Sequence, residues 1–410
     1  MSPNLPPVVE SRPEAERFER IIRHLAQSHG APPALIRVVR APLRISPLGA
    51  HIDHQLGAVM GMAIDRAILL AFAPTVDGTV AVESFDFPTR AQFHLNQVPP
   101  YQKGDWGNYL RGAALALQQE HRLGHGIVGV MDSDMPIGGL SSSAAVTIAY
   151  LLALEEANQL AITPYENIRL VTRTEHEYIG LNNGILDQTS ILFSKRNHLT
   201  RIDCQAVTIE PIPTAAPAGS FEIMAVYSGV DKALVGTSYN NRVAECQAAA
   251  QHLLAAAGVQ KSLPVRLREV DPLLFTQYGA QLEEPQRRRA THFFSEMERV
   301  QEGEAAWRAG DIARFGALMS ASGASSINNY ECGCPQLITL YQILRTTPGV
   351  YGVRFSGAGF RGNCLAFIDP SQREAIADHL HRHYPVAHPE MAQRYSIHFC
   401  QPASAAQLIE

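Results

Sequence analysis

The chain has 410 residues, of which 46% are apolar and 18% are charged, and its formal net charge is −5. This balance supplies enough apolar surface for a sizeable core, so the composition excludes a disordered chain. A slightly acidic chain lacks the positive field that attracts nucleic acids and anionic membranes. We therefore expect no nucleic-acid or membrane partner, and any anionic ligand must be held by local cations or backbone N–H groups.

Targeting and redox features favour a cytoplasmic protein. The first twenty residues have no apolar core of signal-peptide length, and the longest apolar stretch, 144–154, is too short to cross a bilayer. Cys332 and Cys334 could form a metal or redox pair, but free thiols are favoured. The six cysteines follow no disulfide framework: Cys204, Cys246, Cys332, Cys334, Cys364 and Cys400.

The first half of the chain alternates helical and strand-like patterns. The segment TPYE at 163–166 is a capping box with proline at the first helical position, so a helix should run from there to about Tyr178. Helices are also expected at 14–29, 106–120 and 141–160. Strands are expected at 35–40, 61–73, 79–85, 91–95, 126–131, 199–203 and 221–227.

The second half is mainly helical and then alternates. Helices are expected at 238–257, 284–319, 335–346 and 371–383, and strands at 352–355, 364–368 and 395–400. Three prolines within 209–219 mark the most plausible domain boundary. We expect two domains, comprising residues 1–210 and 211–410.

A serine-rich glycine loop, PIGGLSSSA at 136–144, leads directly into an apolar helix. Small residues let the backbone approach an anion, and a helix N-terminus offers free N–H groups and the positive end of a dipole. An ordinary serine N-cap would explain one serine, but hardly three in a row after two glycines. The loop is therefore predicted to bind the phosphates of a nucleotide.

A second glycine segment, GAGFRG at 357–362, matches the dinucleotide fingerprint GxGxxG only formally. An apolar strand follows it, where the fingerprint requires a helix. A glycine turn between two strands, either lining a site or simply packing tightly, fits better. The sequence contains no GxxxxGK[ST], which excludes a P-loop nucleotidase.

Two further segments concentrate polar residues in apolar surroundings. RISPLGAHIDH at 44–54 could bind a metal, contact sugar hydroxyls or serve a structural purpose, and sugar contacts are favoured because no partner cluster of metal ligands occurs elsewhere. Asp187 is a single carboxylate within GILDQTSILF, which is typical of a buried or catalytic residue. Glu175, twelve residues earlier, is a natural Mg²⁺ ligand if it lies beside the serine-rich loop.

These segments together resemble the galactokinase family of the GHMP kinase superfamily. The matching stretches cover residues 35 to 370 in the expected order, and the combination of motifs is specific. They read RISPLGAHIDHQLGAV, WGNYLRG, PIGGLSSSAA, TEHEYIGLNNGILDQ, TSYNNRVAEC and GVRFSGAGFRGNC. Within the family, SPLGAHIDHQ, NYECG and RFSGAGFRGNCLAF resemble the galacturonokinase branch more than galactokinase proper.

The resemblance implies a role for each matching residue. Asp187 would position and deprotonate the anomeric hydroxyl of the sugar, and Arg44 would stabilise charge on Asp187 and on the transferring phosphoryl group. Ser143 and Glu175 would lie around Mg²⁺. The ATP phosphates would be held by Gly138, Gly139, Leu140, Ser141, Ser142 and Ser143, and the sugar would contact His51, Asp53, Gly184 and Tyr239.

The sequence departs from the galactokinase pattern at three places. Ala50 stands where galactokinases have a glutamate, which can accept a hydrogen bond from the C6 hydroxyl of galactose, so galactose itself is in doubt. The phosphate loop is one residue shorter than usual. Arg361 stands where galactokinases have glycine, and it either pairs with a carboxylate of the substrate or is an ordinary surface arginine.

The resemblance implies an α+β fold of two domains. The N-terminal domain would be like domain 2 of ribosomal protein S5, with a left-handed β-α-β unit, and the C-terminal domain would be ferredoxin-like. The expected function is ATP-dependent phosphorylation of D-galacturonate at the anomeric hydroxyl, with Mg²⁺. A galactokinase or broad hexose and hexuronate kinase is the alternative, and a non-catalytic sensor of sugar and ATP is the alternative from another class. Either a monomer or a homo-oligomer is compatible with the sequence.

Overall fold

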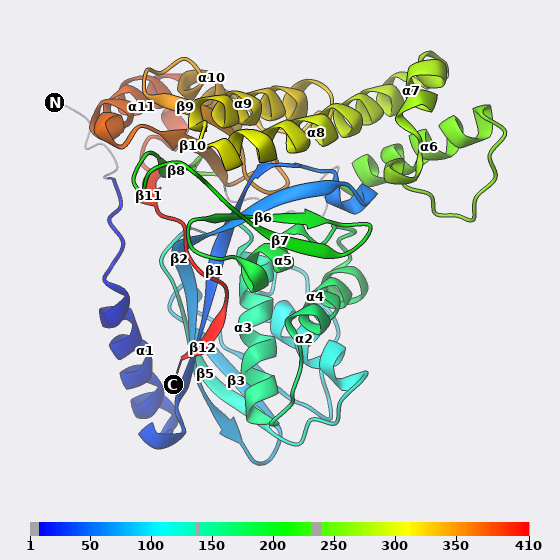
Figure 1. Ribbon diagram of the computed structural model, residues 1–410. Helices are drawn as coiled ribbons and strands as arrows, with labels where there is room; N and C mark the ends of the chain where they lie inside the picture. The colour runs from blue at the N-terminus through cyan, green and yellow to red at the C-terminus, as the bar shows by residue number, and fades with distance from the viewer. Residues whose placement is uncertain (1–7, 137–139, 231–238, 410) are drawn as a thin grey trace.

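Two β-sheets organise the chain, as a computed structural model shows (Figure 1). The structure describes residues 8–136, 140–230 and 239–409, and within them one sheet has eight strands and the other has four. The larger sheet is built mainly from the first half of the chain. The smaller sheet and most of the long helices come from the second half.

In the larger sheet the strands follow the order β12-β1-β2-β5-β3-β4, and β6 and β7 extend it beside β2. β3 and β5 are parallel neighbours joined through β4 and α2, which provides the expected β-α-β connection. The strands are β1 (Arg37–Leu48), β2 (Ala58–Thr75), β3 (Thr79–Ser84), β4 (Ala91–His94), β5 (Gly126–Ser133), β6 (His198–Asp203), β7 (Thr208–Pro213) and β12 (Gln407–Ile409).

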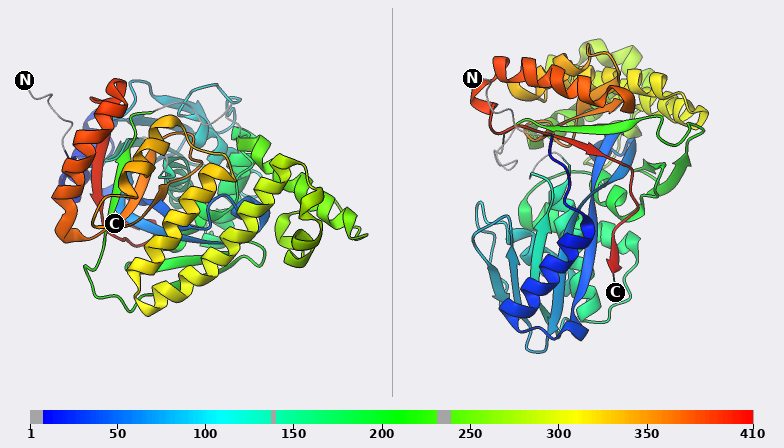
Figure 2. Two further views of the ribbon diagram at one scale, coloured as in Figure 1. Left: turned by 90° about the horizontal axis from the view of Figure 1, so that it is seen from above. Right: turned by 90° about the vertical axis from the view of Figure 1, so that its left-hand side faces the viewer.

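Helices cover both faces of this sheet because its central strands are apolar on both sides (Figure 2). One face packs against α2 (Asn108–Gln118), α3 (Ser142–Ala157), α4 (Pro164–Arg173) and α5 (Leu186–Phe193). The other face carries α1 (Glu14–His29), whose Ile21 and Leu25 are fully buried against it. The capping box predicted for α4 is confirmed, with both reciprocal hydrogen bonds of Thr163 and Glu166 present.

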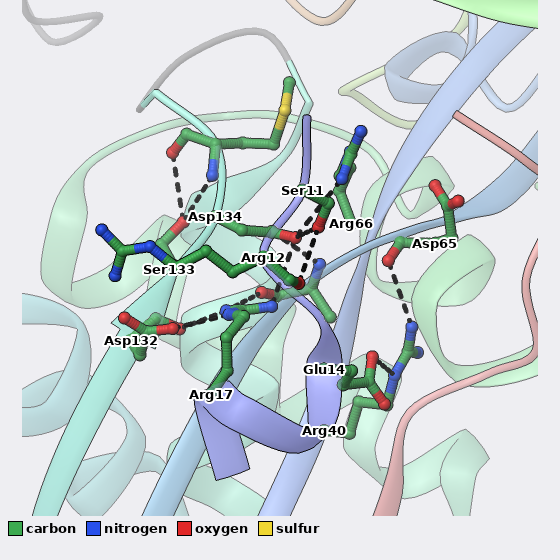
Figure 3. Close-up of polar contacts among 12 residues, drawn as sticks. Ser11, Arg12, Glu14, Arg17, Arg40, Asp65, Arg66, Asp132, Ser133 and Asp134 are labelled. Atoms are coloured by element: carbon green, nitrogen blue, oxygen red, sulfur yellow. Dashed lines mark hydrogen bonds and ion pairs between the residues drawn. The ribbon is translucent and has the colours of Figure 1, made fainter. Parts of the chain in front are cut away.

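Ion pairs join α1 to the end of β5 (Figure 3). Arg17 Nε donates to Asp132 at 2.6 Å, and Arg17 Nη1 lies 3.2 Å from Asp134. Ser11 Oγ also donates to Asp134, at 2.9 Å. The side chains of all three charged residues are buried, so these ion pairs hold α1 against the sheet and are not surface contacts.

The smaller sheet has the antiparallel order β11-β8-β10-β9. Numbered along the chain this is 4-1-3-2, the order of a ferredoxin-like sheet, as predicted. Its strands are β8 (Glu222–Tyr227), β9 (Val350–Phe355), β10 (Asn363–Ile368) and β11 (Ser396–Cys400). The helices of this half are α6 (Tyr239–Ala256), α7 (Pro272–Tyr278), α8 (Glu284–Ala309), α9 (Ile312–Asn328), α10 (Pro335–Leu344) and α11 (Arg373–Ala387).

Figure 1 shows α6 and α7 projecting to one side, while α8 to α11 cover the smaller sheet. The last strand, β12, returns to pair with β1 of the larger sheet. The hydrophobic core is also continuous, since Trp307 and Phe367 belong to the same cluster as the core of the larger sheet. The division of the chain at residue 210 stays a prediction. In the part of the chain described here, no helix is both long and apolar enough to cross a membrane.

Two helices differ from the sequence prediction. The single helix expected at 284–319 is two helices, because Gly310 takes a left-handed conformation (φ 75°) and ends α8. The helix expected at 163–178 is α-helical only to Arg173, and a π-helical turn follows at Thr174–Ile179. That turn carries Glu175, and such turns are frequent at functional sites. All six cysteines are free thiols, as predicted.

Candidate active site

The segment after β1 forms a tight turn that holds Ala50 and His51 against the second half of the molecule. Gly49 has φ 88°, and a side chain there would place its Cβ 2.5 Å from Val59 Cα, so only glycine fits. Glu296 accepts hydrogen bonds from the backbone N–H of Gly49 (2.8 Å) and Ala50 (3.2 Å). The carbonyl of Ala50 lies 2.8 Å from His292 Nε2. Helix α8 therefore fixes the backbone of Ala50 on both sides.

Glu296 is fully buried, yet it is well satisfied. Besides the two backbone donors it accepts from Ser322 Oγ at 2.6 Å and from Arg299 Nε at 2.7 Å. Burial alone would raise the pKa of Glu296, but Arg299, His292 and the hydrogen bonds lower it to about 2. The carboxylate is thus charged at neutral pH, and its role is to hold the turn.

Arg44 and Asp187 form an ion pair at the centre of the site. Arg44 lies on β1, and its Nε and Nη2 both donate to Asp187 Oδ1, at 2.8 and 2.5 Å. Asp187 lies in the first turn of α5, and its other oxygen accepts from Ser141 Oγ. Arg44 Nη1 donates to Ser356 Oγ at 3.2 Å, at the start of the glycine turn after β9. One guanidinium therefore connects the phosphate loop region, the carboxylate and the glycine turn.

Two more carboxylates lie close enough to Asp187 to feel its charge. Burial, and then the charge of Asp187, raises the pKa of Asp53 to about 6 and that of Glu175 to about 8. Asn183 Nδ2 donates to Glu175 at 2.6 Å, and no cation lies within 4 Å of Glu175 among the residues described. The site therefore groups three carboxyls whose charged forms disfavour one another, and a bound cation would favour those charged forms.

Gly184 is needed because Asp53 packs directly against it. A Cβ at this position would lie 2.4 Å from the Asp53 carboxylate. The close approach also brings the N–H of Leu186 to 3.4 Å from Asp53 Oδ2. Substitution of Gly184 would push Asp53 away from the start of α5, and so from Asp187.

Two adjoining cavities meet at the ion pair. They share Arg44, Ser143, Asp187, Gly357 and Ala358. The larger one is otherwise lined by Ile68, Asp86, Phe87, Trp106, Tyr109, Met131, Ser133, Ser141, Ser142, Val146, Gly359, Phe360 and Arg361. The smaller one is otherwise lined by Ser46, Ala50, His51, Asp53, Glu175, Leu181, Asn183, Leu186, Tyr239 and Arg354.

Most of the predicted site residues line one of these cavities. The predicted sugar contacts Ala50, His51, Asp53 and Tyr239 line the smaller cavity, together with Glu175, and Ser143 lines both. Ser141 and Ser142 line the larger cavity, whereas Leu140 is buried behind it and its carbonyl accepts from the N–H of Arg44. Gly138 and Gly139 lie outside the described residues.

Two basic residues of the predicted site region, Arg361 and His54, do not line the smaller cavity. Arg361 lines the larger cavity, beside the aromatic residues and the serines. His54 lines neither cavity, and its ring nitrogens contact Tyr330 Oη (3.0 Å) and Gln55 Nε2 (3.0 Å). Burial lowers the pKa of His54 to about 3, so it is neutral at physiological pH.

Sequence reasoning missed several residues that the structure brings to the site. Arg354 is the single charged residue of β9. An arginine within the otherwise apolar stretch GVRF could have indicated a functional residue. Glu296 and His292 lie four residues apart on α8, and nothing in the sequence of this helix marks them as functional residues. Phe87 and Trp106, whose rings stack at 5.5 Å, come from two separate loops, and although Trp106 opens the stretch WGNYLRG, neither residue was predicted to line the site.

Comparison with known proteins decides the family. Residues 108–195 match the model of the GHMP kinases N terminal domain, residues 304–386 match GHMP kinases C terminal, and residues 24–74 match the galactokinase galactose-binding signature. A galacturonokinase of Arabidopsis thaliana is 42% identical over 97% of this chain and 100% of its own length. The chain belongs to the galactokinase family of GHMP kinases.

Other members of the family agree with this assignment. A galactokinase of Roseiflexus sp. (strain RS-1) is 34% identical over 94% of each chain. The structure of Lactococcus lactis galactokinase complexed with galactose superposes with a TM-score of 0.87 at 26% identity, covering 95% of this chain and 99% of that one. The α+β fold of a two-domain GHMP kinase is therefore confirmed, and the protein is a sugar kinase that uses ATP as co-substrate.

Proposed function

We propose that this kinase phosphorylates D-galacturonate at its anomeric hydroxyl, giving galacturonate 1-phosphate and ADP. The observation that carries the proposal is the smaller cavity. It has the ion pair of Asp187 and Arg44 at the junction with the larger cavity, and Ala50 in its wall where galactokinases have a glutamate. The similarity to the Arabidopsis thaliana galacturonokinase supports the same substrate.

The reaction follows from placing the sugar in the smaller cavity and ATP in the larger one. Asp187 Oδ2, which accepts from Ser141 in this structure, would take the proton of the anomeric hydroxyl. The freed oxygen would attack the γ-phosphorus as the bond from that phosphorus to the bridging oxygen breaks and ADP leaves. Arg44 touches the carboxylate and the junction, so it would neutralise charge that develops during transfer.

The larger cavity suits a nucleotide. Its Phe87 and Trp106 rings form an apolar wall for a base, and Ser141, Ser142 and Ser143 lie at the start of α3, where backbone N–H groups favour phosphate. Arg361 on the glycine turn would add a cation beside the phosphates. The lining of this cavity therefore has an apolar part that would suit the base of ATP and a polar part that would suit its phosphates.

The residues fit Mg²⁺. Ser143 and Glu175 both line the smaller cavity, and Glu175 is a buried carboxylate with no cation near it among the described residues. No group of three His, Cys, Asp or Glu side chains in the described ranges is arranged to hold a metal by itself. Mg²⁺ does not need one, because it commonly uses one or two protein oxygens together with substrate phosphates. Bound there, it would neutralise charge on the phosphate oxygens.

Release of ADP in a coupled assay tests this function. The panel of acceptors is galacturonate, galactose, glucuronate and N-acetylgalactosamine, each measured with Mg²⁺ and with excess chelator. We expect the highest kcat/KM with galacturonate and loss of activity in chelator. Higher kcat/KM with galactose would support the galactokinase alternative, and no ADP release with any sugar would support a sensor.

A further inference from the structure

Arg354 is a buried guanidinium that the protein itself leaves without a carboxylate. Its exposed fraction is 1%, and its side chain lines the smaller cavity together with Ala50 and His51. Nε donates to the carbonyl of Phe355 at 3.0 Å, but Nη1 is buried with no hydrogen-bond partner. Among the residues described, no Asp or Glu oxygen lies within 4 Å of this guanidinium.

An unpaired buried guanidinium lowers the stability of the protein when no ligand is bound. A buried charge is normally paired, because burial removes its hydration, and a buried donor is normally hydrogen-bonded. Burial lowers the pKa of Arg354, with the field of Glu296 opposing that effect. Yet the oxygens of Glu296 are already occupied by Gly49, Ala50, Ser322 and Arg299. Glu296 thus partly offsets the unfavourable burial of the charge on Arg354, without forming an ion pair with it.

The other basic residues near the cavity are either already engaged or uncharged. Arg44 uses Nε and Nη2 on Asp187 and Nη1 on Ser356. His51 stacks on Tyr330 at 4.3 Å and contacts Cys332 Sγ, and burial holds its pKa well below the ordinary value, so it is neutral. In the described lining of the smaller cavity, Arg354 is the one charged donor that remains available.

We propose that Arg354 binds the C6 carboxylate of the sugar and so determines the preference for a hexuronate. The inference rests on the proposed function for the identity of that sugar. Ala50 completes the arrangement, because it lines the same cavity and its side chain has no carboxylate to offer Arg354. Arginine is suited to the task, since its planar donors match a carboxylate at two points.

The pairing also orients the substrate. Arg354 and Ala50 come from β9 and the turn after β1, whereas Glu175 and Asp187 come from the π-helical turn and α5. A uronate held at C6 by the guanidinium would direct its carboxylate to Arg354 and not to Glu175 or Asp187. The same contact would leave the anomeric end free to reach Asp187.

The test compares Arg354→Met with wild type on galacturonate and galactose. We expect kcat/KM for galacturonate to fall about a hundredfold, mainly through KM, because the contact exists before the chemical step. Activity on galactose should stay within about threefold. Arg361→Met is the matched control, since it removes a guanidinium from the larger cavity and should leave the ratio of the two sugars unchanged.

Stability separates substrate binding from a structural role. Replacing an unpaired buried guanidinium by an apolar side chain should leave Tm unchanged or raise it. A large loss of Tm together with equal losses on both sugars would overturn the inference. If Arg354→Met does not fold, Arg354→Lys serves instead, and we expect about a tenfold loss on galacturonate only.

A neutral analogue completes a double-mutant cycle. Galacturonamide lacks the charge, so wild type should prefer galacturonate over it, and Arg354→Met or Arg354→Lys should lose most of that preference. A preference for galacturonate that survives in the variants would overturn this inference alone. A wild-type enzyme that prefers galactose would overturn the proposed function, and this inference with it.

Discussion

The two cavities differ in how they are built. The smaller one is walled by buried charged and polar groups whose backbones are fixed from several elements, such as Ala50, which α8 holds at both its N–H and its carbonyl. The larger one presents stacked aromatic rings and the start of a helix. Under the proposed function, the smaller cavity would select the sugar by charge, and the larger one would hold the nucleotide by stacking and phosphate contacts.

This difference indicates which positions can change the sugar specificity within the family. An alanine in place of a glutamate alters the charge of the smaller cavity without disturbing its scaffold, because Glu296 and His292 contact the backbone of residue 50 and not its side chain. The ion pair at the junction is common to both cavities. Substitutions at the junction should accordingly change kcat, those in the smaller cavity the preference between sugars, and those in the larger cavity KM for ATP.

The largest effect is expected at the junction. Asp187→Asn should lower kcat by about a hundredfold or more, because a positioned base contributes at least that much. Binding of galacturonate, measured by the shift it causes in Tm, should change little. Arg44→Ala should also act mainly on kcat, since the charge that it stabilises develops during transfer. Near-normal turnover in Asp187→Asn would reduce Asp187 to a structural residue.

Acid should weaken the wall of the smaller cavity through His292. Burial lowers its pKa from 6.5 to about 4, opposed by Glu296 and reinforced by Arg299 and Arg354. A histidine with a lowered pKa binds more protons when unfolded, so its contribution to stability is lost as pH falls from 6.5 towards 4. Between pH 7 and pH 5 this amounts to about 2 kcal/mol.

The measurement is urea unfolding of wild type and His292→Gln at both pH values. We expect the variant to lose about 2 kcal/mol less than wild type on acidification. The comparison of the two proteins removes the contribution of other groups, such as Asp53, whose pKa is raised to about 6. Equal losses in both proteins would mean that His292 is not held neutral.

The next effect concerns the sugar. Ala50→Glu should lower kcat/KM for galacturonate at least tenfold and keep or increase it for galactose. Two unit charges about 4 Å apart at an effective dielectric of about 20 repel by about 4 kcal/mol, which outweighs one ordinary hydrogen bond of about 1 kcal/mol. The new carboxylate would also compete for Arg354. An unchanged ratio of the two sugars would show that residue 50 does not face C6, and Ala50→Gln controls for size.

The smallest effect is expected in the larger cavity. Trp106→Ala should raise KM for ATP about fivefold, the low end of what a stacked base contributes, because the ring is only half-buried. KM for the sugar should not change. If KM for the sugar rises instead, the assignment of ligands to the two cavities is reversed.

The sequence predicted the elements better than the site. Helix 14–29 and strand 222–227 lie where the local pattern placed them, give or take a residue. The helix buries one apolar face against the larger sheet, and the strand is buried along its whole length in the smaller sheet. The break at Gly310 was missed, since alanine-rich helical text continues on both sides of it. The short helix α5 was missed as well, because its apolar text suits a strand equally well.

Within the site, the motifs identified residues but not their contacts. Arg44 and Asp187 are 143 positions apart, and only the packing of α5 against β1 brings them together. The absence of a glutamate at position 50 could be read from the sequence. That Arg354 lines the same cavity could not, because it comes from β9, some 300 positions along the chain, and only the fold brings it there.

A crystal structure with galacturonate and a non-hydrolysable ATP analogue would show directly whether Arg354 holds the sugar. We expect the C6 carboxylate at hydrogen-bond distance, about 2.7–3.2 Å, from the guanidinium of Arg354, with the anomeric oxygen at the same distance from Asp187. The nucleotide should lie in the larger cavity against Trp106. A sugar bound with its carboxylate away from Arg354 would rule out that residue as the uronate contact, and a sugar with C1 away from Asp187 would rule out Asp187 as the base.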